Sequence, residues 1–440
     1  MLTNLKLFLL FLTASPWIAS SFTTTPLNYF RLSTSTSASR RIQGSARQFS
    51  AEDDPLEGLD EARRNNLFQC LLRDLQIEEV PLLECDAVQA HTLQAALWTT
   101  MAELSEQDEA QKVCLVLNGI GVDSLRTFVD DFLVIKGQDR LMQHLPELER
   151  FSVSLVGKGA GPAIILETKA KPDSVKPAIS NISDFEESKI IAAMKAFIDR
   201  QIVGLEVCPY TKNINKAPQG IEELGIQPGQ IGYRYCGFQE VCHVLSTFWT
   251  CICEMLSVPD ETLSTTVLAM PAVGTGQESD VQAHNRFSAV AELISHSLCL
   301  YRGDDVFETL HFYPDYNRDL VFPPDIPAHG HLPPSAWLRP MLVKNGNAED
   351  AEKLSDEDLA LSNYQRRAPY TSVVIKRVSY FEALAGSENQ IVDLDLGDGQ
   401  IEKASGVATY ARNARKLAAQ GEIALQTALE NEIIMGRSFQ

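Results

Sequence analysis

The sequence predicts an α/β fold made of two mixed helix–sheet domains and a long C-terminal helix, with an α+β arrangement as the alternative. Helical periodicity alternates with short β-branched runs, first over residues 56–168 and again over residues 185–384. A polar stretch with two prolines, residues 169–184, separates these regions and is typical of a linker. A chain of 440 residues, 45% of them hydrophobic, is long enough for two such domains. No internal sequence repeat is visible.

In the N-terminal domain, apolar residues at helical spacing predict helices at residues 67–75, 87–104 and 122–134. Asp86 is the expected N-cap of the second helix. Apolar or alternating runs predict strands at residues 112–117, 151–156 and 163–167. The glycine-rich stretch between the last two strands is interpreted as a hairpin turn. A phosphate-binding loop leads into a helix, whereas the β-branched residues Ile164 and Ile165 follow this one.

The second domain, residues 185–384, begins with a helix for which Ser183 and Asp184 offer caps. Further helices are expected at residues 238–256 and 281–299. Strands are expected at residues 230–236, 265–269 and 306–312, and a helix or a strand at residues 372–384. Residues 321–340 hold six prolines and are expected to be irregular.

The C-terminal segment, residues 385–440, starts with a polar stretch and continues as an amphipathic helix over residues 403–433. Gly421 interrupts this helix. An amphipathic helix buries its apolar stripe either on its own core or on a protein partner, so the pattern leaves a partner open.

The charge of the chain excludes several classes of function. With a formal charge of −20, the chain lacks the basic footprint that nucleic-acid binding or docking on anionic lipid requires. No apolar run is long enough to span a bilayer, so the processed protein is expected to be soluble and without a membrane partner. The nine cysteines are odd in number and irregularly spaced, which indicates free thiols in a reducing compartment.

Residues 1–50 have the features of a targeting presequence, because they contain no acidic residue and five of the 38 basic residues. Residues 1–20 combine a lysine, a short apolar run and small residues, as a signal peptide does. Residues 21–50 hold twelve Ser or Thr and four Arg, the composition of a transit peptide. The junction Ala19-Ser20-Ser21-Phe22 resembles the Ala-Ser-Ala-Phe motif of bipartite plastid-targeting presequences. The resemblance implies the plastid (chloroplast) stroma, with a mitochondrion or secretion as alternatives.

We expect the presequence, fused to a fluorescent reporter, to direct the reporter into the plastid of an alga whose plastid lies behind extra membranes. Replacing Phe22 with alanine should leave the reporter outside the plastid, because the aromatic residue follows the cleavage point in the motif. Fluorescence microscopy is the measurement. Labelling confined to mitochondria or to the medium would contradict the prediction.

The familiar catalytic and cofactor motifs are absent from the sequence, so no cofactor and no metal are expected. There is no phosphate-binding loop, no nucleophile elbow and no zinc-protease motif. Cys242, Cys251 and Cys253 fall on one expected helix, and the last two project about 200° apart, so they cannot share a metal. With Cys236 they are interpreted as core cysteines. His329 and His331 lie in the proline-rich stretch, where exposure is more common than metal ligation.

Three segments of the second domain carry a resemblance to a known family. They are Ile202-Val203-Gly204-Leu205-Glu206-Val207-Cys208-Pro209-Tyr210, His311-Phe312-Tyr313-Pro314-Asp315-Tyr316 and Asn363-Tyr364-Gln365-Arg366-Arg367-Ala368-Pro369-Tyr370. In order and spacing they resemble an uncharacterised family, known as domain of unknown function 1415, over about residues 186–384. That family has no established activity, so the resemblance implies homology without implying a reaction.

The chain departs from the family pattern at several polar positions. Tyr313 stands where the family has histidine, and Arg366 where it has a second asparagine. The later run His-Leu-Leu-Arg-Glu is replaced here, so that Val374 and Val378 stand in place of its histidine and glutamate. Any acid–base or ligand role of those groups in the family is therefore lost in this chain.

The surviving polar residues suggest a site around a cysteine. Cys208 is the candidate catalytic residue, and the candidate binding residues are Arg234, Asn285, Asn363, Arg367 and Tyr370. A thiol at the C-terminal end of a helix faces the negative end of the dipole, which raises its pKa. A thiolate therefore needs Arg234 or Arg367 beside it, and His284 and His311 are the nearest candidate bases.

Two hypotheses about function follow from this pattern. The first is a small-molecule site, enzymatic or not, in which Cys208 and Arg367 face a small anionic ligand. The second is a non-enzymatic interaction or assembly factor in the plastid, favoured by the lost polar residues and by the C-terminal helix. If Cys208 is instead a buried hydrophobe, Arg367 caps a carbonyl or pairs with an acid.

Overall fold

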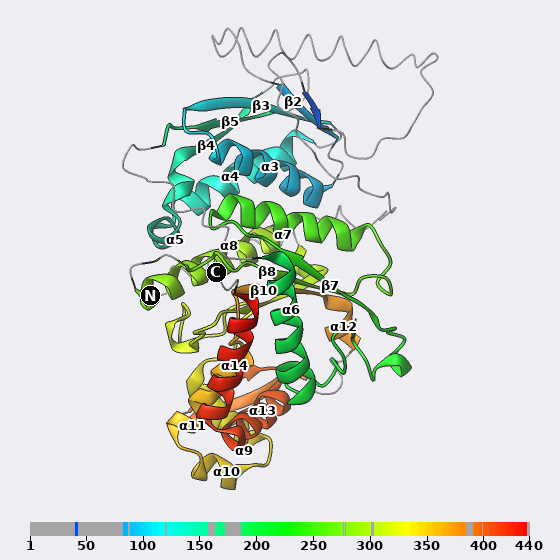
Figure 1. Ribbon diagram of the computed structural model, residues 1–440, viewed down its shortest axis with the longest axis vertical. Helices are drawn as coiled ribbons and strands as arrows, with labels where there is room; N and C mark the ends of the chain where they lie inside the picture. The colour runs from blue at the N-terminus through cyan, green and yellow to red at the C-terminus, as the bar shows by residue number, and fades with distance from the viewer. Residues whose placement is uncertain are drawn as a thin grey trace.

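The computed structural model describes residues 40–42, 82–86, 89–118, 121–156, 163–171, 186–275, 277, 279–300, 303–383, 390–397 and 399–437. These residues form two five-stranded mixed sheets and a separate two-stranded hairpin, with helices packed against the sheets (Figure 1). This combination of helices with mixed sheets confirms the predicted α/β fold class. None of the described helices combines the length and the apolar character that crossing a bilayer requires.

The first sheet lies in the N-terminal half of the chain. Its strands, in spatial order, are β1 (Arg40–Ile42), β2 (Leu82–Asp86), β3 (Gln111–Asn118), β5 (Ala163–Thr168) and β4 (Phe151–Val156). The pairs β1–β2 and β2–β3 are parallel, and β5 pairs antiparallel with both β3 and β4. The β4–β5 hairpin was predicted; its connecting residues 157–162 lie outside the described residues. Strand β1 falls within residues 21–50, the range predicted as a transit peptide.

The helices of the N-terminal half cover one face of this sheet. They are α3 (Ala90–Ser105), α4 (Val122–Lys136), α5 (Asp139–His144) and the 3₁₀-helix η1 (Pro146–Arg150). The prediction that Asp86 caps the first of these helices is wrong, because Asp86 is the last residue of β2. The N-cap is Gln89, whose N–H donates to Thr92 Oγ1 at 3.3 Å. The helix predicted at residues 67–75 lies outside the described residues.

The second sheet lies in the C-terminal half. Its strands, in spatial order, are β6 (Lys216–Ala217), β7 (Gly229–Tyr235), β8 (Thr265–Ala269), β10 (Ser372–Arg377) and β9 (Phe307–Phe312). The pair β7–β8 is parallel, and β10 pairs antiparallel with both β8 and β9. Helices α7 (Val241–Leu256) and α8 (Asp280–Leu300) cover one face of it. The stretch predicted as a helix or a strand at residues 372–384 is both, since β10 leads into α12 (Val378–Ala383).

The two sheets share one connectivity, which no sequence repeat revealed. In each half a strand, a helix and a parallel strand are followed by further helical structure and an outer strand, and the last strand inserts between the two preceding ones. The orders β2-β3-β5-β4 and β7-β8-β10-β9 correspond element by element. The corresponding helices α3 and α7 pack against each other, with Thr99 Oγ1 and Ser246 Oγ hydrogen-bonded at 2.7 Å.

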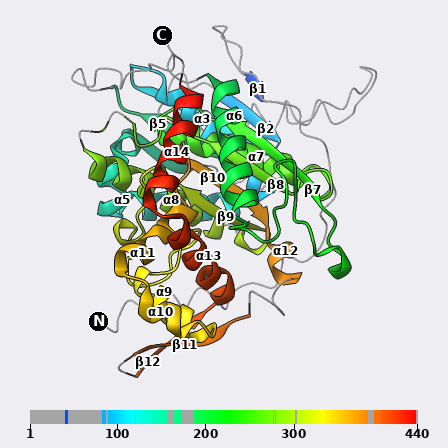
Figure 2. The ribbon, with the colours of Figure 1, turned by 60° about the horizontal axis from the view of Figure 1, so that its bottom comes forward.

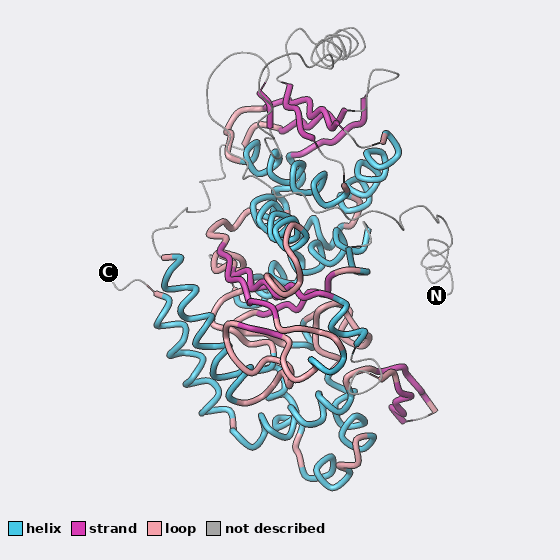
Figure 3. Tube along the Cα trace, turned by 90° about the vertical axis from the view of Figure 1, so that its right-hand side faces the viewer, coloured by secondary structure: helices cyan, strands magenta, loops and turns pink. Residues whose placement is uncertain are grey.

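One hydrophobic core joins the two halves. Trp98 of α3 and Trp249 of α7 are both buried in a cluster that includes residues from both sheets. Figures 1 and 3 show the resulting layers, a sheet, two layers of helices and a second sheet. Residues 172–185, which include most of the predicted linker and both predicted caps Ser183 and Asp184, lie outside the described residues.

The outer face of the second sheet is covered by α6 (Glu187–Phe197), which has Glu186 as its N-cap and continues as the π-helical turn η3 (Ile198–Gly204). Beside α6 lies α14 (Glu422–Gly436), and Figure 2 shows the two helices next to each other. The carboxylate of Glu432 on α14 accepts hydrogen bonds from Arg200 of η3 at 2.6 and 2.9 Å. Together these elements position the chain that follows η3.

The region between β9 and the C-terminus is more regular than the sequence suggested. It contains the 3₁₀-helices η6 (Arg318–Leu320), η7 (Ser335–Trp337) and η8 (Leu361–Gln365), the helices α9 (Leu338–Lys344), α10 (Ala348–Lys353) and α11 (Asp356–Ala360), and the hairpin β11 (Val392–Gly397)–β12 (Gln400–Ala404). The helix predicted at residues 403–433 is two helices, α13 (Val407–Gln420) and α14, which meet at Gly421. Leu425 and Leu429 of α14 pack on Leu361 and Tyr364, so the apolar stripe is buried on the chain's own core.

Candidate functional site

A cavity of about 500 Å³ lies between the outer face of the second sheet, α6 and α13. Alternate residues of a strand point to the same face of its sheet. The floor of the cavity is formed in this way by Val374 and Lys376 of β10 and by Glu308 and Leu310 of β9. Apolar side chains of α6 and η3, among them Phe197, form one wall. Most of the lining is therefore apolar, and the polar groups are few.

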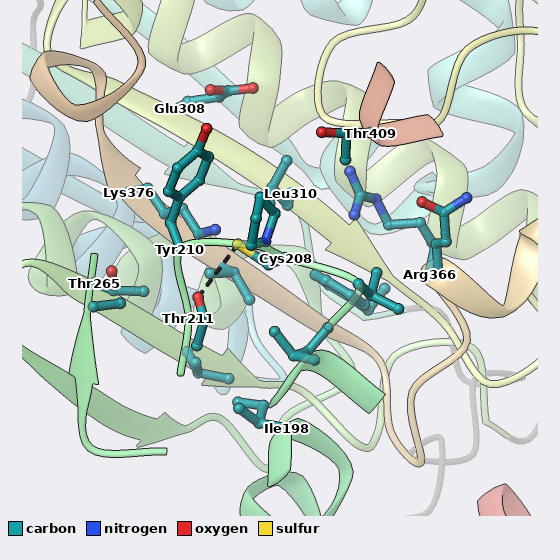
Figure 4. Close-up of a pocket in the computed structure, with 18 of the residues that line it drawn as sticks. Ile198, Cys208, Tyr210, Thr211, Thr265, Glu308, Leu310, Arg366, Lys376 and Thr409 are labelled. Atoms are coloured by element: carbon teal, nitrogen blue, oxygen red, sulfur yellow. Dashed lines mark hydrogen bonds between the residues drawn. The ribbon is translucent and has the colours of Figure 1, made fainter. Parts of the chain in front are cut away.

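Cys208 lies at the edge of this cavity, in the turn that follows η3. The chain reverses sharply there, since Glu206 has a φ of +49°, the left-handed region that non-glycine residues rarely adopt. Lys416 of α13 holds this residue through an ion pair with its carboxylate at 2.7 Å. The turn closes with the Thr211 N–H donating to the Cys208 carbonyl at 3.3 Å. The sulfur is thereby turned into the cavity (Figure 4).

The surroundings of the thiol favour its ionised form. Burial raises the pKa of Cys208, yet the net pKa lies below its ordinary value because three kinds of group outweigh burial. The Lys376 ammonium acts through its charge, the Thr211 hydroxyl donates to the sulfur at 3.4 Å, and the backbone N–H groups of Tyr210 and Thr211 also donate to it. The expectation of a raised pKa at a helix C-terminus is therefore wrong, because the sulfur lies beyond the helix.

Lys376 and Glu308 are cross-strand neighbours on β10 and β9, and both line the cavity. Burial raises the pKa of the Glu308 carboxyl, while the charges of Lys376 and Arg366 oppose this rise. In Figure 4, Cys208, Tyr210 and Lys376 lie on one side of Leu310, and Arg366 lies on the other side beside Thr409. The cavity thus has a thiol on one side and a guanidinium on the other.

Four residues that line this cavity each carry a buried polar atom without a hydrogen-bond partner in the described part of the chain. They are Arg366 Nε, Gln365 Nε2, Ser372 Oγ and Asn413 Oδ1. Arg366 is only 8% exposed, and its guanidinium carbon lies 5.2 Å from the centre of the Phe312 ring. Unpaired buried polar groups cost about 1–3 kcal/mol each, so these four groups around one cavity lower the stability of the folded chain.

Of the predicted catalytic and binding residues, Cys208 alone lines this cavity. Arg234 lies on the same strand as Ile231 but faces α7, where its Nε donates to Glu254 Oε2 at 2.8 Å. The Nε of Arg367 donates to the Tyr316 carbonyl at 3.2 Å, and its guanidinium lies over the Tyr364 ring. Neither arginine therefore shares a cleft with Cys208.

The remaining predicted binding residues also lie outside the cavity. Asn285 lies on α8, on the opposite face of the sheet. The Oδ1 of Asn363 accepts from the Arg318 N–H at 2.9 Å, and the Tyr370 hydroxyl donates to the Ile433 carbonyl at 2.6 Å. Both contacts hold the fold together and leave these side chains without a role at the cavity.

The histidines offered as bases do not reach Cys208. Burial lowers the pKa of His311 to about 3 and that of His284 to about 4, so both are neutral. His311 points away from the cavity and hydrogen-bonds Ser295 Oγ at 3.1 Å. His329 is exposed, as expected, whereas His331 is half-buried and stacks on His311 and Tyr316. The aromatic neighbours of His331 were not foreseen.

No group of three or more metal-ligating side chains forms a metal site among the residues that the structure describes. Cys236, Cys242, Cys251 and Cys253 are all buried with free thiols, which agrees with their interpretation as core cysteines. Lys376 and Arg366, the two cations of the cavity, were missed as site residues. Strand alternation could have placed Lys376 on the same face as Val374, but the partner of that face depends on sheet pairing.

The sequence matches no protein-family model and no curated protein, and the fold matches no solved structure. The resemblance to domain of unknown function 1415 therefore stays a prediction. Arg366 and Val374, two of the positions at which this chain departs from that family's pattern, line the cavity.

Proposed function

We propose that this protein binds a small molecule with an apolar body and one carboxylate in the cavity beside Cys208. The observation that carries the proposal is the set of unpartnered donors on Arg366, Gln365 and Ser372, all buried around one apolar cavity. A guanidinium forms charge-assisted hydrogen bonds with carboxylates, and buried donors with no protein partner are what such a ligand would satisfy.

Charge and size narrow the ligand class. Arg366 is the cation that carries one of the unpaired donors, and a guanidinium matches a carboxylate in both charge and geometry. The volume of about 500 Å³ lies within the range of small-molecule sites. The lining residues include Phe197, Ile202 and Phe312, which would bury the apolar part of a ligand away from water. A carboxylate with an apolar chain therefore matches both the guanidinium and the apolar lining of the cavity.

The plastid stroma is the proposed place of action, supported by the composition of residues 1–50 and by the Ser21-Phe22 junction. The chain's kinship with domain of unknown function 1415 is proposed on the same footing, from the motifs around Cys208, Pro314 and Arg367. Neither proposal is needed for the binding site, which rests on geometry alone.

We expect n-alkanoates such as decanoate to raise the melting temperature of the full chain, while 1-decanol, which has the same chain length without the charge, raises it less. Replacing Arg366 with glutamine should weaken decanoate binding about 10- to 100-fold, because a charge-assisted hydrogen bond contributes about 1.5–3 kcal/mol. Isothermal titration calorimetry measures the affinity.

Arg367→Gln is the matched control, since this neighbouring arginine lies outside the cavity and should leave the affinity unchanged. Equal affinity for decanoate and decanol, or an unchanged affinity in the Arg366 variant, would refute the proposal. Equal losses in the Arg366 and Arg367 variants would mean that the effect is structural, and would refute it as well.

A further inference from the structure

We propose that Cys208 is a catalytic nucleophile which attacks the acyl carbon of an ester, with Lys376 as its acid–base partner. This inference rests on the proposed carboxylate site, because the acid released from such an ester belongs to the ligand class proposed there. The site is more than a lone cysteine, since the same cavity holds the 92%-buried Arg366 with an unpartnered Nε.

The geometry around the sulfur is that of an activated thiol. Residues 207–211 wrap around Sγ, so that a hydroxyl and two backbone N–H groups aim at it. Donors fixed by the backbone stabilise a thiolate without any need to reorganise. Lys376 projects from the face of β10 that forms the cavity floor, and its side chain lies beside Cys208 in Figure 4. A cation next to a thiol stabilises the thiolate, which is the nucleophilic form.

The reaction balances with groups that line the cavity. The Cys208 thiolate attacks the ester carbonyl carbon, the C–S bond forms and the C–O bond to the alcohol breaks. The departing alkoxide takes a proton from the Lys376 ammonium and leaves as an alcohol. The neutral amine of Lys376 then takes a proton from water, whose oxygen attacks the thioester carbon. Breaking the C–S bond releases the acid and restores both the thiolate and the ammonium.

Other titratable groups face the same cavity and enter the pH dependence. They are Glu308 of β9, Arg366, Tyr210 and Tyr410 of α13. Burial raises the pKa of Tyr410, so its hydroxyl stays neutral near pH 7. Glu308 lies across from Lys376, and its carboxylate form would stabilise the ammonium. The thiolate fraction should therefore rise with pH through a midpoint below that of a free thiol.

The first test is alkylation of the full chain by iodoacetamide, followed by peptide mass mapping against pH. Cys208 should react faster at pH 7 than Cys299, although Cys299 is exposed, because burial and Asp304 raise the pKa of the Cys299 thiol to about 11. Lys376→Met should slow alkylation of Cys208 about tenfold or more, since one pKa unit changes the thiolate fraction tenfold. Lys353→Met, an exposed lysine on α10, should leave it unchanged.

The second test uses 4-nitrophenyl hexanoate and measures acyl transfer itself. The full chain should release about one equivalent of 4-nitrophenolate in a burst and carry a hexanoyl group on Cys208 in intact-mass and peptide spectra. Cys208→Ser should lose both the burst and the hexanoyl group. Lys376→Met should still carry the hexanoyl group on Cys208, but its burst and its turnover should be slower.

These outcomes separate the two proposals. Weak decanoate binding with a reactive Cys208 would defeat the proposed carboxylate ligand and leave the nucleophile standing. A Cys208 that reacts no faster than Cys299, or a hexanoyl group on any other residue, overturns the nucleophile. If Cys208 is alkylated at the same rate in the Lys376→Met and Lys353→Met variants, the acid–base role of Lys376 is overturned.

Discussion

Replacing Arg318 with alanine is expected to lower the free energy of unfolding by about 3–5 kcal/mol, as removal of a buried charged group with several hydrogen bonds does. Arg318 lies in η6 and is only 1% exposed. Its guanidinium donates to the main-chain carbonyls of Leu332 at 2.6 Å, Pro323 at 3.1 Å, Val321 at 3.2 Å and Ile326 at 2.5 Å. This one side chain therefore organises the proline-rich residues 321–332.

The loss would come mainly from the carbonyls that remain. Each buried acceptor left without a donor costs about 1–3 kcal/mol, while the cavity left by the side chain adds to this. Urea denaturation measures the change, and Arg318→Lys keeps the volume and one donor group should the alanine variant fail to fold. Arg126→Ala is the matched control, because Arg126 is 61% exposed and should change stability by less than about 0.5 kcal/mol. A loss below 1 kcal/mol at Arg318 would contradict the prediction.

Replacing Arg286 with alanine is expected to have the second large effect, about 3–5 kcal/mol, since it leaves the partly buried Glu147 carboxylate without a counter-charge. Arg286 of α8 binds Glu147 of η1 through two contacts, at 2.6 and 3.2 Å. It also donates to the carbonyls of His144 and Gln239, both at 2.8 Å. The ion pair thus joins the N-terminal half to the C-terminal half where both are partly buried.

A double-mutant cycle tests this second prediction. The variant lacking both Arg286 and Glu147 should be more stable than the sum of the two single losses implies, with a coupling energy of about 1.5–3 kcal/mol. The exposed pair Lys353 and Glu349 is the control and should show a coupling of about 0.5 kcal/mol or less. Additive losses at Arg286 and Glu147 would show that the contact does not fasten the halves together.

The candidate site shows where reasoning from the sequence stops. Cys208 was predicted as a site residue because it lies in a sequence motif, and a motif is made of residues that are close together in the chain. Arg234 was chosen as its companion because it matches the family pattern and lies on an expected strand, but it faces α7 and pairs with Glu254. Lys376, the actual neighbour, is 168 residues away in sequence, on a strand that pairs between β8 and β9. Such a meeting depends on which strands pair and in which register.

The arginines show the same limit at the scale of one residue. Arg366 and Arg367 are adjacent, and the family resemblance pointed to Arg367 as the binding residue. The turn after η8 sends Arg366 into the cavity over Phe312 and Arg367 outward over Tyr364. A local change of backbone direction decided which guanidinium faces a ligand.

The sequence by itself determined most of the elements, because helices and strands of this protein carry their periodicity within a few residues. Strands β4 and β8 begin and end at the predicted residues, and the cysteines of α7 are buried as their spacing on one helix indicated. Only the tertiary structure decided that the two halves share one connectivity and pack α3 against α7. Connectivity and packing arise from contacts between residues far apart in the chain. Many different sequences satisfy such contacts, so the shared fold leaves no repeat in the sequence.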